Sequence, residues 1–169
     1  VRADPRLRSL NADAFHSKRA RKGPTYVECQ ARFMGDDAVN INGDYHLVMS
    51  SRGKELRVLA KHTLDVQPGD RVELVSYDGQ RLPDATAVAV QSDGTIRDEE
   101  RTFVARQRMD SGLKTSRDAL NRAYLVTLDR AVTLPMGSVI CAANRVGNGF
   151  VVKDCVFGSN RSRGILIKA

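Results

Sequence analysis

Residues 34–42 read MGDDAVNIN, and the earlier residues 11–17, NADAFHS, repeat their pattern. When Asp37 is aligned with Asp13, at an offset of 24 residues, a polar residue is followed in both by a tiny one and then by a large apolar one. Residues 163–167, RGILI, fit the same frame. Such recurrence is typical of a parallel β-helix, in which each coil is one repeat and equivalent positions stack. The sequence therefore predicts neighbouring coils.

Stacking predicts which side chains meet. Successive side chains of a strand point to opposite faces, and neighbouring strands lie about 4.8 Å apart. Asp13 and Asp37 would then stack directly, with Asp36 one residue to the side, so three carboxylates would crowd into one patch. Their apolar neighbours are expected to fill the coil interior as one stack: Phe15, Val39 and Ile165.

The domain organisation follows from where the repeat is interrupted. The repeat occupies residues 1–44 and resumes in residues 147–169, whereas residues 45–146 consist of short β-rich runs between Pro, Gly and Asp turn signals. That spacing is typical of a small antiparallel barrel or sandwich. We therefore expect an all-β chain, a parallel β-helix fragment interrupted by an inserted antiparallel β-barrel-like domain. The runs expected to be strands are residues 46–49, 56–60, 71–76, 86–91, 102–106, 124–128 and 139–142, and residues 116–121 are expected to form one helical turn.

The two coil pieces also share a strand before the polar turn. Residues 26–33 and 151–157 are expected to be equivalent, because both runs end in Phe. Cys29 and Cys155 lie in these runs, and Cys141 lies in the insert. An odd number of cysteines without a CxxC motif predicts neither a disulfide framework nor a metal site, so we expect burial as small hydrophobic residues.

Composition excludes some classes of protein. The chain is 41% hydrophobic and 28% charged, as in globular proteins. It contains no run of 18 apolar residues, so the sequence predicts no membrane span. The net charge of +7 fits nucleic acid or acidic polysaccharide, but its spread along the chain favours a solvated basic face. The chain begins at Val1 in mid-repeat, so we expect a fragment of a longer protein whose localisation cannot be read from these ends.

The carboxylate patch suggests acid–base chemistry. Two stacked carboxylates repel each other, which raises one pKa unless a cation intervenes. Arg163 on the next coil would lie beside Asp37 and favour its ionised form. Asp13 and Asp37 are then candidates to hold a water, and Asp36 is the candidate proton donor, an arrangement of the inverting glycosidase type. The alternatives are a plain Gly-Asp-Asp turn, a structural Asp ladder, or a calcium site, although no dense oxygen-ligand loop is present.

Basic side chains near the patch are candidates for substrate binding. His16 either contacts substrate or is a solvated strand residue. Lys18 either lines a subsite or belongs to a solvated loop. Arg163 and Lys168 bracket the last strand, and Arg163 is expected to lie nearer the groove.

Several strings resemble known hydrolases. Asn11-Ala12-Asp13, Gly35-Asp36-Asp37 and residues 163–168 are similar to the Asn-x-Asp, Asp-Asp and Arg-x-Lys signatures of polygalacturonase-type β-helix hydrolases. Longer strings resemble glycoside hydrolase family 110, the exo-acting α-1,3-galactosidases; they are residues 11–17, 20–24, 34–37 and 160–168.

The family 110 resemblance implies a right-handed parallel β-helix with β-barrel insertions, and an inverting mechanism without metal or other cofactor. It implies that Asp36 is the general acid and that Asp13 and Asp37 flank the nucleophilic water. The expected substrate is a terminal α-galactosyl oligosaccharide or polysaccharide, with no nucleic-acid partner. For the parent protein we expect secretion or the periplasm.

Two other hypotheses remain open. One is an inverting hydrolase of acidic galactan or galacturonan, which the basic residues near Asp13 favour, whereas the absence of Gly-His-Gly argues against galacturonan. The other is a non-catalytic carbohydrate-binding or structural fragment, so the isolated chain need not be active. Exposed coil ends would favour homo-oligomers or early melting.

Overall fold

The computed structural model describes residues 8–60, 63–106 and 122–168. The chain divides into two compact units. The first, which we call the parallel unit, comprises Val1–Gly43 and Asn144–Ala169, and the second, the barrel unit, comprises Asp44–Ala143. The barrel unit begins one residue before the expected insert, residues 45–146, and ends three residues before its end. The helical turn expected at residues 116–121 lies outside the described residues.

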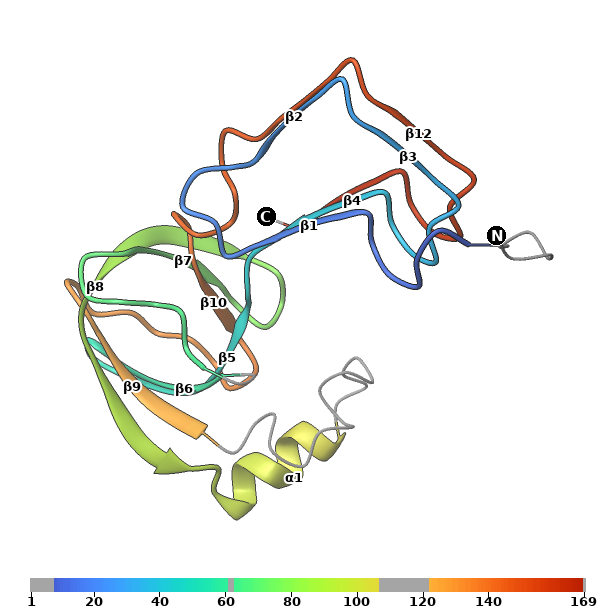
Figure 1. The fold of residues 1–169 in the computed structure, drawn as a ribbon. Helices are drawn as coiled ribbons and strands as arrows, with labels where there is room; N and C mark the ends of the chain where they lie inside the picture. Colours follow the sequence, from blue (N-terminus) through green and yellow to red (C-terminus); the bar gives the residue numbers. More distant parts are fainter. Residues whose placement is uncertain (1–7, 61–62, 107–121, 169) are drawn as a thin grey trace. The chain divides into compact units, whose positions relative to one another are not determined.

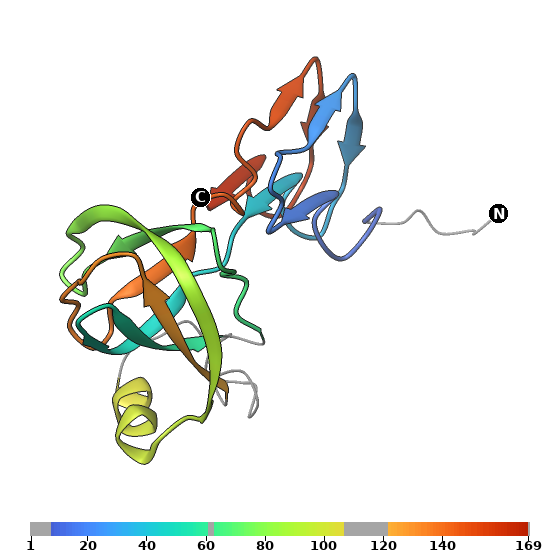
Figure 2. The ribbon, with the colours of Figure 1, turned by 90° about the vertical axis from the view of Figure 1, so that its left-hand side faces the viewer.

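One parallel sheet carries the repeat of the parallel unit, and its strands have the order β1-β4-β13. The strands are β1 (Phe15–Lys18), β4 (Val39–Asn42) and β13 (Ile165–Lys168). Phe15 and Ile165 both pair with Val39, in parallel register. This confirms the register predicted from the repeat, and Figure 2 shows the three strands running in the same direction.

Two further pairs of parallel strands extend this relationship. They join β2 (Thr25–Val27) to β11 (Val151–Lys153), and β3 (Gln30–Arg32) to β12 (Val156–Gly158). Both pairs have the same sequence offset as Asp37 and Arg163, 126 residues. The two chain segments therefore run side by side strand by strand, although the barrel unit separates them in sequence.

The two expected equivalent runs, residues 26–33 and 151–157, do lie side by side, but their terminal phenylalanines are not level. Phe157 pairs with Ala31, and Phe33 corresponds instead to Ser159. Phe33 and Ser159 both adopt left-handed backbone conformations, with φ of 64° and 55°. Phe33 therefore belongs to the corner after the strand, where its side chain is 52% exposed.

The core of the parallel unit is small. Val39 and Ile41 on β4 are fully buried, and the ring of Phe15 contacts those of Tyr26 and Phe157, with centroids 4.8 and 5.9 Å apart. The expected apolar stack is only partly correct, because Ile165 is 46% exposed. It lies on β13, an edge strand of the sheet, so its interior face has a neighbour on one side only.

The barrel unit is a closed antiparallel barrel of six strands in the order β10-β5-β6-β9-β8-β7 (Figure 1). This confirms the all-β, barrel-containing part of the prediction. Fourteen buried residues, among them Leu56, Leu74, Leu128 and Ile140, form one interior cluster. The strands are β5 (His46–Arg52), β6 (Glu55–Ala60), β7 (Arg71–Val75), β8 (Arg81–Thr95), β9 (Arg122–Leu128) and β10 (Val139–Ala142).

The strand expected at residues 102–106 is wrong, because these residues end helix α1 (Asp98–Arg106). The helix begins with three acidic residues, which interact favourably with its positive end. The third, Glu100, accepts the Arg97 N–H at 2.8 Å, as in half of a capping box. Phe103 and Val104 then pack against a second buried cluster that includes Leu47 and Leu59.

Other expectations have mixed outcomes. All three cysteines are free, but only Cys141 is buried, while Cys29 and Cys155 are half-buried. Burial and the nearby carboxylate of Glu73 raise the pKa of the Cys141 thiol to about 12. In the described part of the chain, no helix combines the length and apolarity needed to cross a membrane.

Candidate active site

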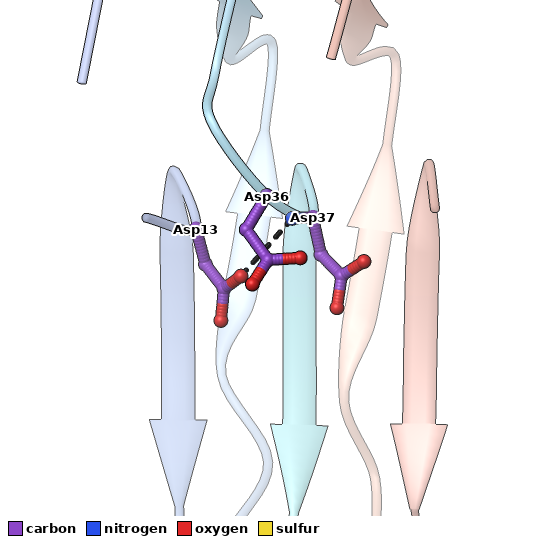
Figure 3. A group of neighbouring side chains, drawn as sticks. All are labelled: Asp13, Asp36 and Asp37. Carbon is purple, nitrogen blue, oxygen red and sulfur yellow. Dashed lines mark hydrogen bonds between the residues drawn. The ribbon is translucent and has the colours of Figure 1, made fainter. Parts of the chain in front are cut away.

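The three aspartates predicted from the repeat converge. Asp13, Asp36 and Asp37 each offer a carboxylate oxygen within 4.8 Å of the others. Figure 3 shows the three side chains side by side. Asp13 and Asp37 each precede their strand by two residues, and the parallel register of β1 and β4 brings them level. The Asp37 N–H donates to Asp13 Oδ1 at 3.0 Å, which joins the two repeats at the site.

Asp37 is held by Arg163. Its carboxylate is 1% exposed and accepts hydrogen bonds at Oδ1 from the Arg163 backbone N–H and Nε, both at 2.9 Å. Arg163 Nη2 donates to Oδ2 at 3.2 Å. Burial alone raises the pKa of Asp37, but hydrogen bonds from Arg163 and Ser162 and the guanidinium charge outweigh it, so the pKa lies below its usual value.

Asp13 is held by two hydrogen bonds and lies beside His16. Besides the backbone N–H of Asp37 at Oδ1, Asn40 Nδ2 donates to Oδ2 at 3.0 Å. His16 Nδ1 lies 3.2 Å from the same oxygen. The side chain of Asp13 keeps 10% exposure, so it is accessible to a small molecule such as water while its orientation is fixed.

Asp36 differs from its neighbours. It is exposed, and no hydrogen bond to its carboxylate is found within residues 8–60, 63–106 and 122–168. The guanidinium of Arg163 interacts electrostatically with it, as it does with Asp13. The three carboxylates thus occupy unequal environments: one buried and ion-paired, one oriented by hydrogen bonds, and one exposed.

The predicted substrate-binding residues are not all near the aspartates. His16 lies next to Asp13, and Arg163 is engaged with Asp37, although its side chain keeps 55% exposure. Lys18 and Lys168 align with Asn42 from either side, at the end of the sheet away from the aspartates. Sequence analysis missed Asn40 and Asn42, although the polar positions of VNIN beside the Asp13 repeat could have indicated them.

Among the described residues, these three aspartates also lie close enough together to ligate a metal ion. The arrangement already contains a positive charge, because Arg163 contacts both oxygens of Asp37. Asp13 likewise has donors at both oxygens. Hydrogen bonds thus already occupy both carboxylates of Asp13 and Asp37, whereas the exposed carboxylate of Asp36 is open to water or a polar substrate.

No protein-family model matches the chain, and no curated protein gives a significant match.

Proposed function

We propose that this chain carries the catalytic site of an inverting exo-glycosidase that hydrolyses terminal α-linked galactose. The observation that carries the proposal is the convergence of Asp13, Asp36 and Asp37 in three different environments. Glycoside hydrolysis needs one carboxyl group as a proton donor and another that acts on the opposite face of the sugar. Unequal surroundings are how one site assigns different roles to similar groups.

The exposed Asp36 is the general acid in this proposal. It transfers its proton to the glycosidic oxygen as the bond from that oxygen to the anomeric carbon breaks. Water, oriented by Asp13, adds its oxygen to the anomeric carbon and gives a proton to Asp13. The buried charge of Asp37, fixed by Arg163, stabilises the positive charge that develops on the sugar.

The separation of the carboxylates bears on the stereochemistry. Inverting glycosidases usually have carboxyl groups about 6.5–9.5 Å apart, and retaining ones about 5–5.5 Å. Here the nearest oxygens lie within 4.8 Å, which favours a retaining hydrolase as the second candidate. Inversion is preferred because hydrogen bonds at both oxygens of Asp13 and Asp37 weaken them as nucleophiles.

The supporting scaffold in this proposal is a right-handed parallel β-helix. The parallel sheet and two parallel strand pairs at a constant offset support it, as do the strings that resemble glycoside hydrolase family 110. The choice of galactose rests on that resemblance alone. Acidic galactan remains the alternative substrate, and a non-catalytic sugar-binding role is the alternative function.

The test is a panel of α-galactosides and α-galacturonides with good and poor leaving groups, applied to the full protein. Asp36→Asn should lower kcat/KM for poor leaving groups by about 10²–10⁴-fold, the usual contribution of a general acid. It should lower kcat/KM much less for activated aryl galactosides, because a good leaving group needs less protonation of the glycosidic oxygen. Asp13→Asn and Asp37→Asn should damage both substrate types alike.

The matched control is Asp154→Asn. Asp154 is exposed, lies in the same unit, and occupies a left-handed corner with φ of 52°, which Asn tolerates. Its substitution should leave activity unchanged. Equal losses for all leaving groups in Asp36→Asn would refute the acid role, and a wild type inactive on the whole panel would refute the proposed function.

A further inference from the structure

A closed ring of polar contacts, three of them hydrogen bonds, joins side chains of β1 and β4 to Asp13. Asn42 Nδ2 donates to Asn40 Oδ1 at 3.0 Å and lies 3.1 Å from His16 Nε2. Asn40 Nδ2 and His16 Nδ1 both contact Asp13 Oδ2, at 3.0 and 3.2 Å. The ring therefore runs from Asn42 to Asp13 by two routes, through the amide and through the imidazole.

Only one set of orientations satisfies this ring. An amide nitrogen can donate but cannot accept, so His16 Nε2 must accept from Asn42, and the ring proton of His16 must be on Nδ1. A reversed Asn42 amide would place its oxygen against Asn40 Oδ1. A reversed Asn40 amide would place its oxygen against the Asp13 carboxylate. Asn42 Oδ1 itself has no hydrogen-bond partner in the part of the chain described, so the hydrogen bonds of Nδ2 alone determine the orientation of that amide.

We propose that His16 is a positioning residue for Asp13, acting as a neutral imidazole whose Nδ1–H tautomer is selected by Asn42. The inference rests on the proposed function for its catalytic consequence. Both ring nitrogens of His16 face protein atoms rather than substrate. His16 therefore orients the carboxylate that receives the proton from water, and a substrate can reach only the exposed part of its ring.

The first readout does not depend on activity. Long-range ¹H–¹⁵N correlations report which ring nitrogen carries the proton, and the chain has only three histidines, so loss of a signal in His16→Asn assigns it. At about pH 8, above the ordinary titration range of histidine, the wild type should show the Nδ1–H tautomer. Asn42→Leu should shift His16 toward the other tautomer. A predominant Nε2–H tautomer in the wild type would overturn the inference.

The second readout uses two replacements that each keep half of the imidazole. In His16→Asn the amide nitrogen can take the place of Nδ1 and still donate to Asp13, whereas in His16→Gln the amide reaches the place of Nε2. We expect His16→Asn to keep kcat within about threefold, and His16→Gln to lower it by about 10–100-fold, as for other residues that orient a functional ligand, with KM changed by less than about threefold.

The two failures are distinguishable. A rise in KM at unchanged kcat in both variants means uniform substrate binding and would overturn the positioning role. Equal kcat losses in His16→Asn and His16→Gln would also overturn it, because the Nδ1 donor would then be irrelevant. A wild type with the Nδ1–H tautomer but no glycosidase activity would refute the proposed function and still support the tautomer proposed for His16.

Discussion

The barrel unit and the parallel unit use β-structure in different ways. The barrel closes on itself, so none of its six strands is an edge, and its interior is filled by a cluster of fourteen buried residues. In the parallel unit, β1 and β13 are both edge strands, and Ile165 and Ile167 remain 46% and 45% exposed. Hydrophobic burial therefore stabilises the barrel more than it stabilises the parallel unit.

Polar interactions differ in the same way. In the barrel, the buried Arg57 joins β6 to Glu100 of α1, with Nε 2.5 Å from Oε1, and also binds Asp93 and the Thr95 carbonyl. In the parallel unit, Arg163 binds Asp37 from an exposed position. The Arg57–Glu100 pair connects two elements of a core and is buried on both sides. In the Asp37–Arg163 pair, solvent and a substrate can reach the arginine.

The largest expected effect is the loss of Arg57. Arg57→Met leaves the buried carboxylate of Glu100 without its ion pair, and breaking a buried pair in this way typically costs about 3–5 kcal/mol. Urea unfolding of the barrel should show this loss. Arg52→Met, at an exposed position on β5, is the control and should have little effect. Similar losses for both variants would contradict the role assigned to the Arg57–Glu100 pair.

Matched isoleucines test the difference in packing. Ile140→Ala in the barrel interior, at 0% exposure, should cost about 2–5 kcal/mol, as is usual for a buried Ile→Ala change. Ile165→Ala, at 46% exposure, should cost much less. Equal losses of unfolding free energy would mean that a neighbouring surface covers Ile165 in solution, which sedimentation velocity would then show as an oligomer.

The Asp37–Arg163 pair predicts a pH dependence of the parallel unit. Because the pKa of Asp37 is lowered on folding from 3.8, its contribution is present above that pH and is lost as the pH falls through the folded pKa. Protection of the β4 amides against hydrogen exchange, after correction for the pH dependence of the intrinsic rate, should fall below about pH 4 in the wild type. In Asp37→Asn, exchange should be faster at pH 7 and depend less on acid. An identical acid response in both proteins would exclude this pair as its source.

The smallest expected effect concerns two glycines. Gly53, between β5 and β6, has a φ of 60°, so Gly53→Ala should destabilise the barrel by about 1–2 kcal/mol. Gly158 on β12 has neither a positive φ nor an atom within 4 Å of an added Cβ. Gly158→Ala should therefore change stability by less than about 0.5 kcal/mol, as for ordinary surface changes. Thermal unfolding of both variants measures the difference.

Much of this arrangement follows from sequence spacing. The offset between Asp13 and Asp37 predicted the register, because equivalent positions of the repeat pair directly, and the alignment of residues 163–167 with the same frame placed Arg163 beside Asp37. The sequence pattern does not reveal the helix at residues 98–106, because the short apolar run in residues 102–106 fits a strand as well as the end of a helix. It does not reveal the exposure of Ile165 either, because a repeat pattern does not show which repeat lies at the edge of the sheet.

The sequence pattern also does not indicate the ring of polar contacts around Asp13. Asn40 and Asn42 belong to the same strand pattern as Val39 and Ile41, and nothing in their residue types distinguishes a ladder of solvated amides from a ring that orients a carboxylate. That distinction depends on side-chain orientation across two strands, which spacing alone does not determine.

The most direct test of the proposed mechanism is the anomer released first from an α-galactoside. Proton NMR during the first turnovers of the full protein follows it before the sugar equilibrates. Attack by a water oriented by Asp13 inverts the anomeric carbon, so β-galactose should appear first. If α-galactose appears first, the water mechanism is wrong and one of the aspartates of the site is a nucleophile, as the short separation of the carboxylates would then explain.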